Sequence, residues 1–249
     1  MISKNKIKYL KSLHLKKNRI LHKKFVVEGD KLVKECLKFA KNATSLWATE
    51  EWLNNNRQKI PAHIETSSVS DRELKSISQL KTPNQVLILM SVKHDDQTPI
   101  DQDQRFYLYL DGIRDPGNLG TILRTSQWFG FNKILCSPDC VELYNHKVIQ
   151  ATMGAFLHVE LIQLEADQLK RKLPDHRIIS TTMSGDNMYH ATFDKKSILV
   201  IGNEGQGISS KLLRLSDNKI SIPKATESNI DSLNAAVSAA LVMAYIKNP

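Results

Sequence analysis

Short apolar runs alternate with amphipathic segments along the chain, at the spacings typical of strands and helices. In the first part, an apolar strand is predicted at 25–27 and a helix at 32–39. The next predicted elements are strands at 45–48, 63–65 and 86–91 and helices near 50–57 and 70–77. This order predicts a small α/β unit.

The second part begins with an apolar strand at Phe106–Leu110 and continues the alternation. Helical and strand-like segments follow at 118–129, 133–136, 146–152, 158–162, 166–171, 177–182, 197–201, 209–214, 219–222 and 231–246. Such alternation predicts an α/β fold with a mostly parallel sheet that helices cover on both faces. We therefore expect two domains, residues 1–91 and 105–249, joined by a polar, acidic, proline-containing linker at 92–104.

Charge divides the chain in the same way. The 249 residues carry 35 Lys and Arg against 26 Asp and Glu, a net charge of +9. Residues 1–100 hold 19 basic and 10 acidic side chains, whereas residues 101–249 hold 16 of each. The surplus is densest in residues 1–24, which have nine basic side chains and no acidic one. Like charges this close repel one another unless a polyanion is near, which favours a phosphate-backbone partner over a merely solvated lysine-rich surface.

Cysteine usage indicates a reducing compartment. Cys36, Cys136 and Cys140 cannot all pair, and a chain of this size needs no disulfide. Because Cys136 and Cys140 have no second Cys or His pair near them, we predict buried thiols and no metal. No apolar run approaches the roughly 18–20 residues of a membrane span, and the basic segment runs directly into a predicted strand, unlike an organelle presequence. We expect a cytoplasmic protein with no membrane partner.

Three turns at the ends of predicted strands carry residues suited to ligand binding, and open parallel sheets bind ligands beyond the carboxyl ends of their strands. In the first, Pro116 and Gly117 make the turn, and Asn118 is expected to cap the next helix. Arg124 lies one helical turn beyond Gly120, so a guanidinium would share a face with a position that has no side chain.

The second turn, G-N-E-G-Q-G at 202–207, directly follows an apolar strand. Its glycines allow the backbone to approach a ligand and to offer it N–H and C=O groups. The spacing matches neither a dinucleotide-binding fingerprint nor a phosphate-binding loop. In the third, Ile222 and Pro223 are followed by D-S-L-N at 231–234, where Asp231 or Ser232 is expected to cap an alanine-rich helix.

Taken together and in this order, the three segments resemble the three motifs of the SpoU family of RNA methyltransferases, within the SPOUT superfamily. The matching residues are Asn118, Gly120 and Arg124, then Gly202, Asn203, Glu204 and Gly207, then Ile222, Pro223, Ser232, Leu233 and Asn234. The likeness runs from about residue 106 to 247. The first domain also resembles the family's common substrate-binding domain, in Arg19, residues 25–29 and Thr82-Pro83. The third motif departs from the family pattern, since residues 224–230 contain no glycine and Asp231 replaces the usual glutamate.

The resemblance implies a catalytic domain whose last segment forms a trefoil knot, and a homodimer. It also implies that S-adenosylmethionine is held in a bent shape by backbone groups of the second and third motifs. In this chain the implied cofactor-binding residues are Ile201, Gly202, Gly207, Ile222 and Leu233.

The implied reaction is methyl transfer to a ribose 2′-hydroxyl of structured RNA, with Arg124 as the principal catalytic residue. Because a guanidinium stays protonated at any working pH, we expect Arg124 to clamp the adjacent phosphate and stabilise the developing alkoxide, not to act as a base. Asn118, Glu204, Ser232 and Asn234 are expected to orient the ribose and Arg124.

RNA contacts are expected from the basic segment, through side chains that bind phosphates without reading bases. The predicted contacts are Lys16, Lys17, Arg19, Lys23 and Lys24. Ribosomal RNA is the favoured substrate. Three alternatives remain open: a transfer RNA ribose methyltransferase, an RNA base methyltransferase, and a non-catalytic RNA-binding protein of the same fold.

Overall fold

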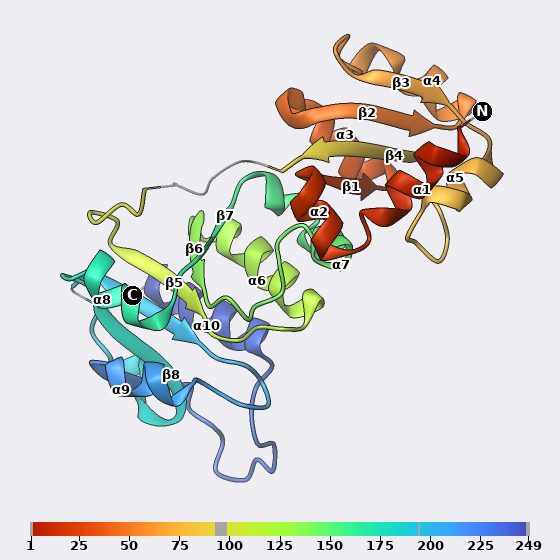
Figure 1. Cartoon of the computed structure of the whole chain (residues 1–249). Helices are drawn as coiled ribbons and strands as arrows, with labels where there is room; N and C mark the ends of the chain where they lie inside the picture. Colours follow the sequence, from red (N-terminus) through yellow and green to blue (C-terminus); the bar gives the residue numbers. More distant parts are fainter. Residues whose placement is uncertain (1, 93–98, 194, 248–249) are drawn as a thin grey trace. The chain divides into compact units, whose positions relative to one another are not determined.

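The computed structural model describes residues 2–92, 99–193 and 195–247 (Figure 1). Its contacts divide the chain into two units. The first combines Met1–Asp95 with Tyr144–Leu157, and the second combines Asp96–Leu143 with His158–Pro249. No described helix is both long enough and apolar enough to cross a membrane.

The first unit is built on a four-stranded sheet in the order β1-β4-β2-β3. Its strands are β1 (Lys24–Glu28), β2 (Ala43–Ala48), β3 (Glu65–Ser68) and β4 (Val86–Ser91). β4 pairs antiparallel with β1 and β2, whereas β3 pairs parallel with β2. The helices are α1 (Lys4–Ser12), α2 (Lys16–His22), α3 (Asp30–Lys38), η1 (Ala40–Asn42), α4 (Glu50–Asn56), η2 (Arg57–Lys59), α5 (Asp71–Ile77), α7 (His146–Thr152) and η3 (Ala155–Leu157).

The basic segment at 1–24, to which the sequence pattern assigned no element, forms α1 and α2. Ser3 caps α1 by accepting a hydrogen bond from the backbone N–H of Lys6 at 3.2 Å. Leu10 and Leu13 are 0% and 1% exposed, in a cluster that includes Leu87 and Leu89 of β4. The segment is therefore part of the core of this unit.

Residues 144–157, predicted within 105–249, belong to the first unit. Phe25 of β1 packs against Tyr144 at 4.4 Å between ring centroids and against Phe156 at 6.1 Å. The side-chain amide of Gln150 donates to the carbonyl of Glu28 at 2.9 Å. Aromatic packing and this hydrogen bond hold α7 on β1.

The predicted linker at 92–104 falls partly on residues 93–98, which lie outside the described residues. Its last part packs on the second unit, where Ile100 contacts the core and the hydroxyl of Tyr107 donates to the carbonyl of Asp101 at 2.9 Å. Lys196 also pairs with Asp103 at 2.8 Å. Residues 99–104 are thus attached to the second unit.

The second unit is built on a six-stranded sheet in the order β10-β8-β9-β5-β6-β7, in which every neighbouring pair is parallel. The predicted α/β fold with a parallel sheet is confirmed, while the trefoil knot stays a prediction. The strands are β5 (Phe106–Leu110), β6 (Lys133–Cys136), β7 (Glu160–Gln163), β8 (Arg177–Asn187), β9 (Ser197–Ile201) and β10 (Asn218–Ser221). The helices are α6 (Pro116–Trp128), α8 (Ala166–Lys172), η4 (Met188–His190), α9 (Ser210–Leu215) and α10 (Ala235–Lys247).

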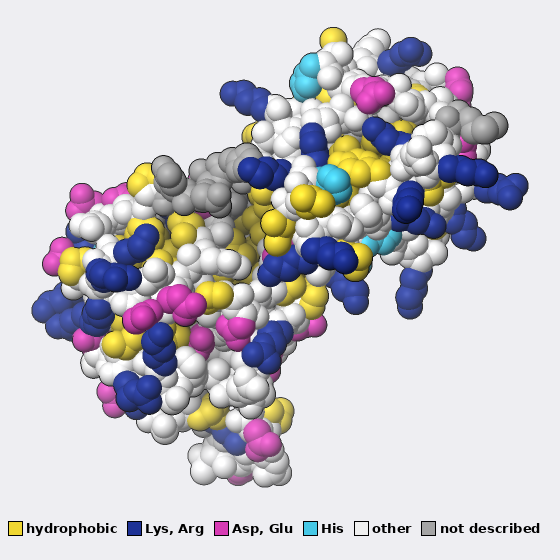
Figure 2. Space-filling view, in the orientation of Figure 1, with side chains coloured by type: hydrophobic (Ala, Val, Ile, Leu, Met, Phe, Trp, Pro, Cys, Tyr) yellow, Lys and Arg dark blue, Asp and Glu magenta, His cyan; other side chains and the backbone are white. Residues whose placement is uncertain are grey.

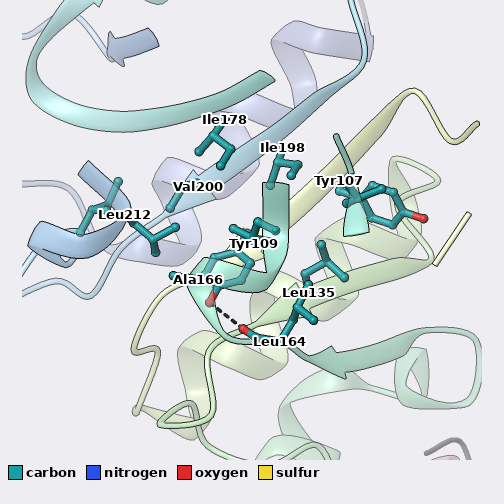
Figure 3. Close-up of a cluster of buried hydrophobic side chains, with 12 residues drawn as sticks. Tyr107, Tyr109, Leu135, Leu164, Ala166, Ile178, Ile198, Val200 and Leu212 are labelled. Atoms are coloured by element: carbon teal, nitrogen blue, oxygen red, sulfur yellow. Dashed lines mark hydrogen bonds between the residues drawn. The ribbon is translucent and has the colours of Figure 1, made fainter. Parts of the chain in front are cut away.

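One face of this sheet is covered by α8 and α9 (Figure 3). Tyr107, Tyr109, Ile198 and Val200 point to this face at alternate positions of β5 and β9, and Leu212 of α9 joins them. The hydroxyl of Tyr109 donates to the carbonyl of Leu164 at 2.8 Å, so this buried polar group is satisfied.

The other face is associated with α6 and α10. The hydroxyl of Ser126 in α6 lies 3.5 Å from the sulfur of Met243 in α10, and both side chains are fully buried. Cys36, Cys136 and Cys140 are buried free thiols, as predicted.

Two helix starts differ from the prediction. The cap of α6 is Asp115, whose carboxylate accepts from the backbone N–H of Asn118 at 2.8 Å. α10 begins at Ala235, where the side chain of Asn234 accepts from the N–H of Ala236 at 2.9 Å. In both cases several neighbouring residues are able to cap the helix. The path of the backbone before the helix decides which of them does so. The side chain of Asn118 is consequently directed to other partners.

Candidate cofactor and catalytic site

The first two turns lie together because β5 and β9 are neighbours, with Leu110 beside Ile201. The side-chain amide of Asn203 donates to the carbonyl of Gly112 at 2.9 Å. The carboxylate of Asp111 accepts from the backbone N–H of Ser209 at 2.6 Å. These two bonds tie the ends of the strands to each other.

The second turn closes on itself around two glycines. Asn203 and Gly207 exchange backbone hydrogen bonds of 3.0 and 2.8 Å. A Cβ added to Gly202 would lie 2.5 Å from the carbonyl carbon of Gly207, and Gly207 itself has a φ of +67°. Gly202 is therefore required for close backbone approach, and Gly207 for its left-handed conformation.

A cavity of about 620 Å³ lies at this turn, within the size range of small-molecule sites. It extends to the chain after β10, so the third predicted segment contributes one of its walls. All five implied cofactor-binding residues line it, namely Ile201, Gly202, Gly207, Ile222 and Leu233. The atypical loop also lines it, through Lys224, Ala225, Ser228 and Ile230.

The sequence reasoning missed two threonines in this cavity. Thr181 and Thr182 lie where the pairing of β8 with β10 jumps, from Ser180 beside Lys219 to Asp186 beside Ile220. Their hydroxyl oxygens are buried and have no hydrogen-bond partner among the described residues. Two threonines at the end of an apolar run are typical strand residues, so the sequence carried no signal for this bulge.

These features fit S-adenosylmethionine. Ile201, Ile222 and Leu233 supply apolar surface suited to an adenine ring. The glycine turn offers backbone donors and acceptors, and the hydroxyls of Thr181 and Thr182 lack partners that a ribose or an amino acid group could provide.

Beside the cavity, three predicted catalytic residues form one polar network. The side-chain amide of Asn118 in α6 donates to the carboxylate of Glu204 in the second turn. The amide of Asn234 donates to the side-chain oxygen of Asn118 at 2.8 Å. Asn118 therefore joins all three motifs, across 86 residues to Glu204 and 116 residues to Asn234.

The other two predicted catalytic residues lie outside this network. Ser232 lines the cavity and is exposed, and its hydroxyl makes no hydrogen bond within the part of the chain that the structure describes. Arg124 is exposed on α6 and is absent from the cavity wall. Neither a hydrogen bond nor an ion pair joins it to any described residue. Within one chain, no such bond therefore links Arg124 to the network.

The predicted RNA contacts of the first unit divide into two groups. Lys16, Lys17 and Lys23 are exposed. Arg19 is 4% exposed and donates to the carbonyls of Leu13 at 2.6 Å and His14 at 2.8 Å, so it holds the turn between α1 and α2. The side chain of Arg19 thus folds back on α1, and its contact with RNA stays a prediction. Lys24 is half-buried, and burial, followed by the charge of Lys6, lowers its pKa.

No group of three His, Cys, Asp or Glu side chains among the described residues is arranged to hold a metal ion. The polar groups of the site are the amides of Asn118 and Asn234, the carboxylate of Glu204, several hydroxyls and the backbone of the glycine turn.

Comparisons with known proteins agree with this geometry. Residues 105–244 match the SpoU rRNA Methylase family, and residues 4–88 match the MRM3-like substrate binding domain. The chain is 27% identical over 251 residues to the 23S rRNA (guanosine(2553)-2'-O)-methyltransferase RlmP of Bacillus subtilis, covering 97% of this chain and 96% of that protein.

Solved structures share the whole architecture. A TrmH-family protein from Porphyromonas gingivalis superposes with a TM-score of 0.85 at 32% identity, covering 98% of this chain and 97% of that one. The SpoU methyltransferase AviRb from Streptomyces viridochromogenes, solved with AdoMet, has the same TM-score at 19% identity and shares the fold, over 98% of this chain and 97% of that one. On the match over 105–244, this chain belongs to the SpoU family of methylases.

Proposed function

We propose that the protein transfers a methyl group from S-adenosylmethionine to a ribose 2′-hydroxyl of ribosomal RNA. The observation that carries this proposal is the network of Asn118, Glu204 and Asn234, which joins three distant motifs beside a cavity suited to the cofactor. Two relatives support ribosomal RNA, since RlmP and the RlmB of Neisseria meningitidis are both 23S rRNA guanosine 2′-O-methyltransferases. The buried free thiols support action in the reducing cytoplasm.

When bound, S-adenosylmethionine supplies an electrophilic methyl group on a sulfonium sulfur. The residues of this chain have to bring a hydroxyl into line with that group and stabilise the charge that develops on its oxygen. Asn118 and Asn234 offer amide groups to the ribose, and Glu204 fixes the orientation of Asn118. Arg124 binds the adjacent phosphate and remains charged throughout.

We also propose a homodimer formed through α6 and α10. Trp128 of α6 is 82% exposed, and Val237 and Leu241 of α10 are 47% and 37% exposed. Exposed apolar side chains on two packed helices are typical of an interface. Because Arg124 lies on the same helix as Trp128 and outside the cavity of its own chain, we assign it to a site that two copies complete together.

The function is tested by mapping 2′-O-methyl groups in RNA from cells with and without this gene, and by incubating the purified protein with the unmodified RNA and S-adenosylmethionine. Digestion to nucleosides and mass analysis should show a methylated ribose in ribosomal RNA. A methylated base or a transfer RNA product would replace the proposed substrate, and a folded protein that binds no cofactor would contradict an enzymatic function.

Two substitutions of Asn234 should separate its role as the cap of α10 from its role in catalysis. Asn234→Ala loses both the cap of α10 and the donor to Asn118, so we expect a loss of about 1 kcal/mol of stability and of most activity. Asn234→Ser keeps a capping oxygen but no amide donor, so it should restore stability without restoring turnover. Thermal denaturation and methyl-transfer rates check this. Full activity in Asn234→Ser would show that the bond to Asn118 has no catalytic role.

The exposed lysines in α2 and at its C-cap should contribute affinity for RNA without preference for its sequence. Replacing Lys16, Lys17 and Lys23 with alanine should reduce the slope of log Kd against log salt by about two to three, since each phosphate contact contributes about 0.7–0.9. The triple arginine variant, which keeps the charge, should retain the slope. Fluorescence anisotropy with labelled RNA over a salt series measures it. An unchanged slope in the alanine variant would remove these lysines from the interface.

A further inference from the structure

The first unit contains a cavity of about 600 Å³ in addition to the proposed cofactor site. It lies where β1 begins and β4 ends, beside the connection from α3 to β2 and the 144–157 segment. Phe25, Met90 and Phe156 are 2%, 2% and 3% exposed and form its apolar floor. This volume is in the range of small-molecule sites.

Aromatic rings are concentrated in this cavity. Phe25 and Tyr144 lie 4.4 Å apart between centroids with their planes tilted by 33°, and Phe156 meets Phe25 edge to face at 85°. Phe39, at the end of α3, is 46% exposed and lines the same cavity. The exposed side chain of Phe39 beside a buried apolar floor provides a surface on which a planar ring can stack.

The polar side chains that line the cavity are basic or neutral. Lys38 and Lys41 are exposed. Lys38 forms an ion pair with the surface carboxylate of Glu35 at 2.7 Å, a contact worth little in water. Asn42 and Ser91 offer hydrogen-bonding groups. None of the lining residues is acidic. Figure 2 shows many Lys and Arg side chains on this unit.

We propose that this cavity binds one unpaired nucleotide of the RNA substrate, a proposal that rests on RNA being the substrate. The base stacks on the aromatic surface at Phe39 and Tyr144, Asn42 or Ser91 bonds its edge, and Lys38 and Lys41 bind the flanking phosphates. A base within a duplex is stacked on both sides and cannot enter a cavity of this kind, so the site selects a bulged or looped nucleotide.

The test uses the full chain and two RNA hairpins, one with a single bulged 2-aminopurine nucleotide and one without the bulge. We expect the bulged hairpin to bind about tenfold more tightly, because stacking one base on an aromatic side chain contributes on that scale. Binding should quench the 2-aminopurine fluorescence. With 4-thiouridine in the bulge instead, photocrosslinking should label peptides that contain Phe39 or Tyr144.

Matched variants separate stacking from bulk and charge. Phe39→Ala and Phe39→Leu should both lose most of the preference for the bulge and the quenching, since leucine restores apolar volume but no ring. Lys41→Ala should weaken binding of the bulged hairpin, whereas Lys75→Ala, on α5 outside the cavity, should keep the preference unchanged. Circular dichroism checks that each variant is folded.

Equal affinity of the wild-type protein for both hairpins would overturn the proposal, as would a wild-type preference in folded Phe39→Ala. These outcomes differ from a failure of the proposed function. A protein that methylates ribosomal RNA without preferring the bulge refutes the nucleotide site alone. A protein that prefers the bulge without methyl transfer refutes the enzymatic function alone.

Discussion

Arg124→Ala is expected to lower turnover by about 10²–10³-fold with little change in cofactor affinity. Removing one donor aimed at a developing oxyanion costs about 2.7–4 kcal/mol in other enzymes. Arg124 is exposed and has no partner among the described residues, so the substitution should not destabilise the fold. Single-turnover methyl transfer and calorimetry with S-adenosylmethionine measure the two effects. Near wild-type turnover in the folded variant would exclude Arg124 from catalysis.

Arg124→Lys is the matched control. It keeps the charge but loses the planar fork that binds a phosphate in two places, so an intermediate loss is expected. A larger loss than in Arg124→Ala would contradict a charge-stabilising role.

Mixing two impaired variants, at a cofactor concentration too low to fill the Gly202→Ala site, tests whether Arg124 acts on its partner's site. If it does, a mixture of Arg124→Ala with Gly202→Ala should recover about a quarter of wild-type activity, because half of the dimers are mixed and each has one intact site. No recovery, in a mixture shown to exchange subunits, would place Arg124 at the site of its own chain.

Gly202→Ala is expected to weaken cofactor binding strongly. The added Cβ would lie 2.5 to 2.6 Å from backbone atoms of Gly207 and Ile208, so the turn must open. Overpacking of this kind costs about 1–3 kcal/mol, which corresponds to a roughly 5- to 150-fold weaker Kd if the turn binds the cofactor. Calorimetry with S-adenosylmethionine measures the affinity.

Gly205→Ala provides the comparison within the same turn. The nearest atom to its added Cβ is the side-chain oxygen of Asn203 at 3.6 Å, an ordinary contact, and the loss should therefore be much smaller. Equal losses in the two variants would mean that any alanine in the turn is harmful and that the close approach at Gly202 has no special role.

Local pattern was sufficient for several strands of the second unit and for α7, which belongs to the first unit. The strands at Phe106–Leu110, Lys133–Cys136 and Ser197–Ile201 and the helix at His146–Thr152 have the bounds that the sequence predicted. These are short apolar runs or amphipathic turns, whose conformation depends on residues within a few positions. The motif residues were equally visible, because each turn is a contiguous stretch of sequence.

Which residues of the first unit are buried was harder to predict from the sequence. Charge dominated the sequence of residues 1–24, yet Leu10 and Leu13 are core residues and Arg19 is enclosed by the turn that it holds. An isolated stretch shows which side chains are basic, but not which of them fold back onto a neighbouring helix. That depends on the packing of α1 against strands formed more than ten residues later.

The sequence by itself determined the parallel α/β architecture, the location of the basic surplus, and the three segments that carry the family motifs. Only the tertiary structure joined Asn118 to Glu204 and Asn234, placed Thr181 and Thr182 in the cavity wall, and attached Tyr144–Leu157 to the first unit. The physical reason is the distance along the sequence over which the interactions act. Periodicity and turn chemistry act over a few residues, whereas these contacts form between side chains that are distant in sequence and meet only when sheet order and packing bring them together.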